Sequence, residues 1–231
     1  MALTDNLIAY YKLDGNSNDS VGSNNGTDTN ITYSTDYGKI NQGARFQSNS
    51  SKIELVTAST LGLGGTSLSF SCWCRVETPS SSAGYILGFQ SSSSYTFFEW
   101  AGFRVQTDGK LRFTFYTTSG SFKEYTSPNN PNIMNDGKKH HIVFNYDGAS
   151  VKVYIDNSLF WTQNITGTIS FNSTEPLRIG VGHPAAFYNG GIDEVGIWNK
   201  ALSSTEITEL YNSGNGLQYP FGNPGAFFQL F

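Results

Sequence analysis

Residues 190–214, GGIDEVGIWNKALSSTEITELYNSG, decide how the rest of the chain is arranged. Val195 and Ile197 occupy alternate positions, and alternate side chains share one face of a strand. Asp193 lies two residues before Val195, so we expect its side chain on the same face, directed toward a core. Because a buried carboxylate without a partner is costly, Asp193 predicts a cation or hydrogen-bond donors beside it.

A short amphipathic helix is predicted directly after this strand. Ser203 and Glu206 have the spacing of a capping box, and Gly214 is expected to end the helix. The apolar side chains at the hydrophobic-staple positions and on the helical stripe are Leu202, Ile207, Leu210 and Tyr211. A single helix of this kind, late in a strand-rich chain, must lie on a sheet to bury its stripe.

The strand-like remainder of the chain favours one all-β domain. Alternating apolar residues recur in short segments from residue 7 to residue 181, and Asp108-Gly109 and Asp147-Gly148 are hairpin signals between such segments. About a dozen short strands with one late helix indicate a two-sheet antiparallel sandwich. Cys72 and Cys74 share a face of one strand, so we expect two small buried hydrophobes rather than a disulfide.

Composition excludes several classes of partner. The chain has 14 basic and 18 acidic residues, and no Lys/Arg run, so we expect no nucleic-acid partner. No apolar run is long enough to span a membrane. The first 15 residues, MALTDNLIAYYKLDG, lack the pattern of an export signal, which favours a chain that is not exported by that route.

Two segments carry a resemblance to a known family. The closing segment 191–214 and the opening segment 7–26, LIAYYKLDGNSNDSVGSNNG, resemble the laminin-G-like branch of the concanavalin-A-like jelly rolls. The resemblance covers residues 6–216 and implies a two-sheet jelly-roll sandwich with a short C-terminal helix. We therefore expect a domain over residues 1–218 and an aromatic tail over residues 219–231. This fold hosts lectins, adhesion modules, enzymes and virion proteins, so it does not give the function.

The expected carboxylate pattern of a glycosidase is missing. Retaining hydrolysis needs two carboxylates about 5 Å apart, which alternate positions on one strand would supply. No predicted strand carries such a pair, since Asp193 and Glu194 are adjacent and face opposite sides. His140 and His141 also face opposite sides, without a nucleophile motif beside them. We expect no enzymatic activity.

A structural Ca²⁺ is the chemical hypothesis that the acidic loop residues favour. Calcium takes carboxylate, amide and carbonyl oxygens, and residues 14–30 are rich in Asp, Asn and Gly. The resemblance implies a calcium between the beginning and the end of the domain, which points to Asp19 and Asp193. The alternative is that Asp19 caps a turn through its own backbone and that Asp193 pairs with Arg45 or with backbone amides.

Two aromatic segments are candidates for ligand binding. Aromatic rings stack on the apolar faces of sugars while Asn, Arg and His bind hydroxyl groups. The candidate ligand-binding residues are Trp100, Arg104, His183, Phe187, Tyr188 and Asn189. The alternative for the first segment is a place in the core. In the second segment, adjacent Phe187 and Tyr188 cannot both point inward.

These patterns together predict a non-catalytic, lectin-like carbohydrate-binding module. The low charge, the Ser/Thr/Asn/Gly richness and the aromatic tail favour a phage or viral virion-surface protein that binds a glycan or host polysaccharide. The tail would contact other virion subunits in a homo-oligomer or larger assembly, or else pack back on its own domain. The alternative is an extracellular, secreted or cell-surface, adhesion or carbohydrate-binding module, or a glycoside-active enzyme.

Overall fold

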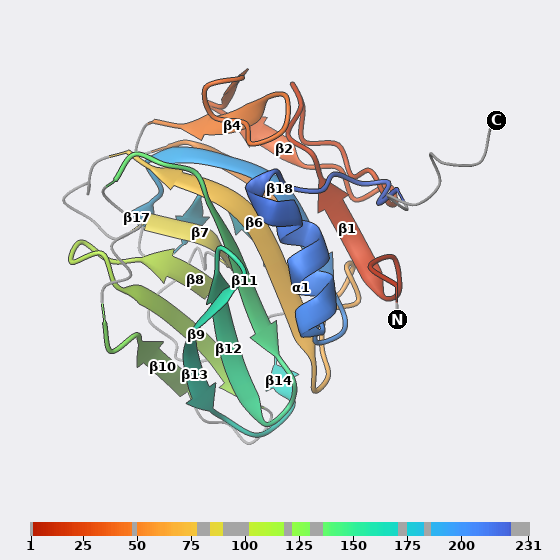
Figure 1. Ribbon diagram of the computed structural model, residues 1–231, viewed down its shortest axis with the longest axis vertical. Helices are drawn as coiled ribbons and strands as arrows, with labels where there is room; N and C mark the ends of the chain where they lie inside the picture. Colours follow the sequence, from red (N-terminus) through yellow and green to blue (C-terminus); the bar gives the residue numbers. More distant parts are fainter. Residues whose placement is uncertain are drawn as a thin grey trace.

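Two antiparallel sheets pack face to face, and one helix lies on the outside of one of them (Figure 1). The computed structural model describes residues 2–47, 50–77, 84–89, 102–117, 122–129, 136–170, 175–182 and 186–222. Sheet A comprises β1 (Leu7–Tyr11), β3 (Thr32–Ser34), β4 (Gly43–Phe46), β6 (Leu68–Val76), β11 (His140–Tyr146), β12 (Ser150–Ile155), β13 (Ser158–Asn164) and β18 (Gly190–Trp198). Sheet B comprises β2 (Thr27–Thr29), β5 (Lys52–Thr57), β7 (Gly84–Phe89), β8 (Gly102–Val105), β9 (Leu111–Thr117), β10 (Phe122–Thr126), β14 (Ile169–Ser170) and β15 (Pro176–Ile179). The predicted all-β sandwich with one late helix is confirmed.

The strand order shows why the closing segment organises the chain. Sheet A runs β13-β12-β11-β6-β18-β4-β3, with β1 also paired to β18, so the last strand joins the beginning of the chain to its middle. Sheet B runs β10-β9-β8-β7-β15-β5-β2, with β14 paired to β9. A small hairpin of β16 (Val181–Gly182) and β17 (Ala186–Phe187) lies beside β7.

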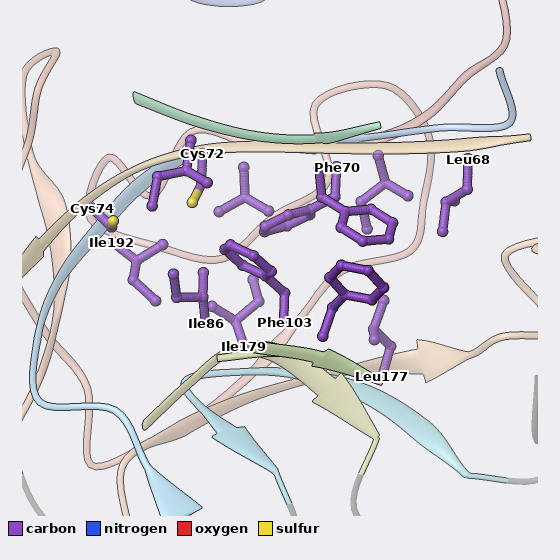
Figure 2. Packing of buried hydrophobic residues seen from close by; sticks show 14 of the residues in the cluster. Leu68, Phe70, Cys72, Cys74, Ile86, Phe103, Leu177, Ile179 and Ile192 are labelled. Carbon is purple, nitrogen blue, oxygen red and sulfur yellow. The ribbon is translucent and has the colours of Figure 1, made fainter. Parts of the chain in front are cut away.

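The core lies between the two sheets. Figure 2 shows Phe70, Cys72 and Cys74 of β6 directed toward Ile86 and Ile179 of sheet B. Both cysteines are free and buried, as the sequence predicts. Burying a side chain the size of phenylalanine contributes about 1.5–3 kcal/mol, so this continuous apolar layer is what holds the sheets together.

The helix α1 (Ser204–Tyr211) lies on the outer face of sheet A (Figure 1). Its capping box between Ser203 and Glu206 is present, as predicted. The predicted stop at Gly214 is wrong, because Asn212 ends the helix with a left-handed backbone (φ 47°) and begins a short 3₁₀ turn, η1 (Asn212–Gly214). Asparagine tolerates this conformation better than most residues. The apolar stripe packs with residues of the sheet and the N-terminus in a second cluster of Leu3, Val143, Trp198, Leu202, Ile207 and Leu210.

A buried polar network fixes the segment before the helix. The side-chain oxygen Oδ1 of Asn145 accepts from the Leu202 backbone amide at 3.0 Å. The side-chain Nδ2 of Asn145 donates to the Leu202 backbone carbonyl at 2.8 Å. Lys200 and Glu206 form an ion pair at 2.5 Å, and each is under a tenth exposed. Since buried polar groups need partners, these contacts fix where α1 begins.

A β-bulge in β18 overturns the expected placement of Asp193. Ile192 and Val195 both lie in the main core although they are three residues apart. The pairing of β18 with β6 shifts between Asp193 and Gly196, and Glu194 has a left-handed backbone (φ 51°). The extra residue of a bulge breaks the alternation of side chains. Asp193 therefore does not share the face of Val195, and the prediction that it points into the main core is wrong.

The described end of the chain returns to the first strand. The ring centroids of Tyr219 and Phe221 lie 5.9 and 5.4 Å from that of Tyr10. The tail predicted at residues 219–231 thus begins in contact with the domain, while residues 223–231 lie outside the described part. The boundary at residue 218 stays a prediction. Within the described residues, no helix is both long and apolar enough to cross a membrane.

Candidate functional site

The outer face of sheet B carries two rows of side chains across four neighbouring strands. Tyr85, Arg104, Arg112 and Thr126 are successive cross-strand partners on β7, β8, β9 and β10. The adjacent row is Gly88, Gly102, Thr114 and Glu124. On β8 and β9 these residues alternate with core residues such as Phe103 and Phe113. They therefore point away from the core, and we call this surface the sheet B outer face.

Glycines allow the Tyr85 ring to lie close to the backbone of this face. A Cβ atom on Gly102 would lie 2.7 Å from Cε1 of Tyr85, and one on Gly182 would lie 2.3 Å from its Cγ. Carbon atoms do not approach this closely, so larger residues there would displace the ring. The Arg104 guanidinium lies 5.3 Å from the centroid of the same ring, in cation–π range. Burial raises the pKa of Tyr85, and the positive charge of Arg104 opposes that rise.

The charges of this face are incompletely paired. Arg112 forms an ion pair with Glu124 at 2.8 Å, and its Nε donates to the Thr126 hydroxyl at 3.1 Å. Arg104 has no carboxylate partner among the described residues, and its Nε is buried without a hydrogen-bond acceptor. The Thr114 hydroxyl is also buried and has no partner among the described residues. Because Tyr85 and Thr114 are only 5 % and 6 % exposed, the half-buried side chains of Arg104 and Arg112 are what this face offers to a ligand.

Of the predicted ligand-binding residues, the structure places Arg104 on the sheet B outer face. Trp100 and His183 lie outside the described residues. Phe187 lies half-buried in β17, beside β7.

Tyr188 is 2 % exposed and packs its ring against Phe46 at 6.1 Å, so the expectation that it stacks a ligand is wrong. Asn189 donates to the Glu77 carbonyl at 2.8 Å. The alternation after Phe187 turns the second aromatic ring into the core.

Sequence reasoning missed Tyr85, Arg112, Thr114 and Glu124. The signal for Arg112 and Thr114 was available, because polar residues alternate with Leu111 and Phe113 in the sequence. No sequence signal links Tyr85 to these residues. Its place depends on three glycines from different strands, which only the fold brings together.

A second feature is an acidic cluster between the beginning and the end of the chain, which we define as Tyr10, Asp14, Asp193, Glu194 and Gln218. Asp193 is 1 % exposed, and its Oδ2 accepts from the amides of Lys39 and Ile40 at 2.6 and 3.0 Å. Its Oδ1 is buried and has no hydrogen-bond partner among the described residues. Burial, with a further contribution from the Glu194 charge, raises the pKa of Asp193 to about 9. One carboxylate oxygen of this cluster therefore remains unsatisfied.

The other members of the acidic cluster are joined by hydrogen bonds. The Glu194 carboxylate accepts from the Tyr10 hydroxyl and from the Gln218 amide, both at 2.5 Å. The same amide donates to Asp14 at 2.9 Å. Burial raises the pKa of Glu194 to about 7, and the Asp14 charge adds to that rise. The cluster ties β1, β18 and the segment that follows α1 to one another.

Among the described residues, Asp193 has a carboxylate oxygen without a hydrogen-bond partner, whereas both oxygens of Asp19 are occupied. Oδ1 of Asp19 accepts from the Val21 amide of its own turn and from the Tyr10 amide of β1, and Oδ2 accepts from the Asn24 amide. Asp19 therefore caps its turn, which is the alternative to a metal ligand given for it above. Asp193 likewise accepts from backbone amides, but only through Oδ2. The described residues contain no group of three or more His, Cys, Asp or Glu that could hold a metal, so a cation at Asp193 would need amide, carbonyl or water oxygens as further ligands.

A serine–histidine pair within the described residues is buried. The Ser71 hydroxyl and Nε2 of His141 are 2.8 Å apart, and both residues are 2 % exposed. They lie on the outer face of sheet A next to Trp73, whose ring stacks on Tyr211 of α1. Burial lowers the pKa of His141 to about 4. The pair therefore acts as a buried polar contact under the helix.

Comparison with known families identifies the fold. The family model Laminin_G_3, described as the concanavalin A-like lectin/glucanases superfamily, matches residues 47–208. The chain belongs to this superfamily. The resemblance stated for residues 6–216 is thereby confirmed at the level of the family, as is the concanavalin-A-like fold. No curated protein sequence matches the chain.

Solved structures with this superfamily fold include binding domains. Domain 4 of AbnA, a GH43 extracellular arabinanase from Geobacillus stearothermophilus, was solved in complex with arabinotriose. It matches at TM-score 0.68 and 22 % identity over 88 % of this chain and 97 % of that domain. The binding domain of Paraclostridial Mosquitocidal Protein 1 matches at TM-score 0.70 and 16 % identity, over 92 % of this chain and 53 % of that one.

The binding domain of Botulinum neurotoxin DC, solved in complex with rat synaptotagmin II, matches at TM-score 0.70 and 16 % identity. The alignment covers 92 % of this chain and 52 % of that domain. This chain thus spans about half of each of the two toxin domains. At these identities the likeness shows the fold.

Proposed function

We propose that this protein is a non-catalytic carbohydrate-binding module whose ligand site is the sheet B outer face. The observation that carries the proposal is the row Tyr85–Arg104–Arg112, where two half-buried guanidinium groups lie side by side and the buried Tyr85 ring supports Arg104. Sugars present many hydroxyl groups, and guanidinium groups donate hydrogen bonds to them. The arabinotriose complex of the arabinanase domain supports a sugar as ligand for this fold.

The local chemistry suits an oligosaccharide better than a compact ligand. Four neighbouring strands about 4.8 Å apart give the row a length of about 14 Å, which exceeds one sugar ring. Glu124 supplies an acceptor beside Arg112, toward the β10 end of the row. A chain laid across the strands would meet these groups in sequence.

The test is a glycan microarray followed by calorimetry, with and without EDTA. Arg112→Gln should weaken binding about tenfold or more, because hydrogen bonds to charged groups contribute about 1.5–3 kcal/mol. Arg45→Gln is the matched control, since Arg45 also pairs with a glutamate, at 3.7 Å, but lies on sheet A. An array without any bound glycan would overturn the proposal. Release of reducing ends from a bound glycan would overturn its non-catalytic part.

We also propose that a structural Ca²⁺ binds at Asp193. The unsatisfied Oδ1 of Asp193 and its raised pKa support a cation as the group that would complete this site. The Asp14 and Glu194 carboxylates lie close enough to raise the pKa of Asp193 electrostatically, so the cation would interact with them too. A bound cation would neutralise Asp193 and hold together the beginning and end of the domain. Glycan binding that persists in EDTA would separate this cation from the ligand site.

We further propose that the module is displayed on a virion surface, with residues 223–231 as the contact to other virion subunits or to further copies of the chain. The low charge and the aromatic residues of that segment support this placement. A truncation should begin at residue 223, because Tyr219 and Phe221 pack on Tyr10. Loss of assembly with retained glycan binding is the expected result. Unchanged assembly would favour a free extracellular module.

A further inference from the structure

We propose that the glycan bound on the sheet B outer face is acidic and that Arg104 receives its carboxylate group. This inference rests on the proposed carbohydrate-binding function and names the substrate class of the same site. It follows from the charge balance around Arg104, from the geometry of its guanidinium group and from the length of the row.

Among the described residues of this face, one guanidinium has no carboxylate partner. Arg112 is paired with Glu124 at 2.8 Å, and farther along the sheet Arg178 is paired with Glu54 at 2.8 Å. Arg104 has no acidic partner within the described residues. Arg104 and Arg112 together thus carry two positive charges against the single charge of Glu124. This local excess stands out in a chain whose net charge is −4.

The register places the two guanidinium residues in direct opposition. Arg104 and Arg112 are cross-strand partners on β8 and β9, and like charges at opposed positions destabilise a sheet. The Tyr85 ring offsets part of this cost through its contact with Arg104, but a ring does not neutralise a charge. An arriving anion would relieve the repulsion between the two guanidinium groups.

The geometry of the unused donor favours a carboxylate over a hydroxyl group. Nε of Arg104 is buried and has no acceptor among the described residues, so a ligand would meet the two Nη groups of this side chain. The two Nη groups of one guanidinium match the two oxygens of a carboxylate in a two-pronged contact. A neutral sugar hydroxyl could accept one such bond but would leave the charge uncompensated.

The length of the row favours a polysaccharide over a small anion. The Tyr85 ring is 5 % exposed and packs against Gly102 and Gly182, so it supports Arg104 and leaves the guanidinium groups of the row to contact a ligand. In a polyuronate a carboxylate projects from each sugar ring, so one of them can reach Arg104. A chain of such units would also pass Arg112 and Thr114.

The experiment compares four polysaccharides by calorimetry with the complete chain. Polygalacturonate carries free carboxylates, its methyl-esterified form carries the same backbone without them, arabinan is neutral, and dextran sulfate carries a different anion. We expect polygalacturonate to bind at least tenfold more tightly than its esterified form and than arabinan. Dextran sulfate tests whether charge alone suffices, and equal binding to it would overturn the assignment of a carboxylate.

Variants of Arg104 connect the preference to this side chain. Arg104→Gln should reduce binding of polygalacturonate about tenfold or more and bring its affinity to within about twofold of that for the methyl-esterified form. Arg104→Lys keeps the charge but not the two-pronged geometry, and it should restore only part of the affinity. Arg45→Gln is the control, and thermal melts establish that each variant is folded.

The possible outcomes distinguish the preference for an acidic glycan from carbohydrate binding as such. Binding of neutral glycans without preference for the acidic polymer overturns this inference and leaves the carbohydrate-binding function standing. Failure to bind any glycan, on the array or here, overturns both. Acidic preference that survives Arg104→Gln places the carboxylate elsewhere and overturns the assignment to Arg104.

Discussion

Replacing Asp193 by Asn should stabilise this protein in the absence of divalent cations. Asp193 is 1 % exposed, and burial raises its pKa to about 9, compared with about 3.9 in an unfolded chain. At pH 7 the folded state must therefore keep a proton that the unfolded state releases. The gap of about three units between 3.9 and 7 corresponds to about 4 kcal/mol of lost stability.

The net gain from the substitution is smaller than this cost. Asparagine keeps a carbonyl oxygen for the amides of Lys39 and Ile40, so those two hydrogen bonds remain. Its NH₂ group would replace the unpartnered Oδ1, and a buried donor without an acceptor costs about 1–3 kcal/mol. We therefore expect Asp193→Asn to raise the free energy of unfolding by about 1–3 kcal/mol at pH 7 in EDTA.

The pH dependence has a defined sign. Because the folded state binds more protons than the unfolded state between pH 4 and pH 9, the wild-type stability contribution of Asp193 falls as pH rises through that window. Below about pH 4 both states are protonated and the penalty is absent. Asp193→Asn should lose this slope.

Urea unfolding of both proteins at several pH values, with EDTA or with excess Ca²⁺, measures these effects. If Ca²⁺ binds at Asp193, it should stabilise the wild type by about 2.7 kcal/mol at a concentration a hundred times Kd and leave Asp193→Asn unchanged. A variant that is less stable than the wild type in EDTA, with the same pH slope, would refute the buried-charge reasoning. Equal Ca²⁺ responses of both proteins would refute the site.

Three further predictions test the helix attachment, the buried histidine and the ligand face. Glu206→Ala should cost about 3–5 kcal/mol in urea unfolding, because it leaves the buried Lys200 ammonium unpaired and removes the capping box, whereas full stability would show that Lys200 is solvated. His141 has a pKa lowered to about 4 by burial, so wild-type stability should fall by about 3 kcal/mol from pH 6.5 to pH 4, and His141→Gln should lose this dependence; an unaltered acid limb in unfolding curves would contradict it. Gly102→Ala should displace the Tyr85 ring, destabilise the fold by about 1–3 kcal/mol and weaken glycan binding in calorimetry, and unchanged affinity would remove Tyr85 from the site.

The elements of this fold that depend on local sequence were predictable. Ser203 and Glu206 form the predicted capping box because both partners lie within one helical turn. The turn at Asp108-Gly109 joins β8 to β9 because glycine adopts the positive φ that the turn needs, here 77°. Cys72 and Cys74 are buried and unpaired because alternation fixes the face they share.

The candidate ligand site was predicted only in part. Arg104 was identified from a segment rich in aromatic residues, but Tyr188 of the second segment lies in the core. The site also needs Tyr85 and Arg112, which become neighbours of Arg104 only through the pairing of β7, β8 and β9. Cross-strand register is a property of the assembled sheet, and composition does not reveal it.

The sequence by itself determined the all-β class, the late helix with its cap and the family, because periodicity, capping and turn chemistry act over a few residues. Only the tertiary structure decided where the charges lie. The bulge at Glu194 inserts one residue into β18 and turns Asp193 from the main core toward the amides of Lys39 and Ile40. Those amides lie more than 150 residues away in the chain. Such partners depend on which strands become neighbours, so the chemistry of Asp193 follows from the packing of the whole sandwich.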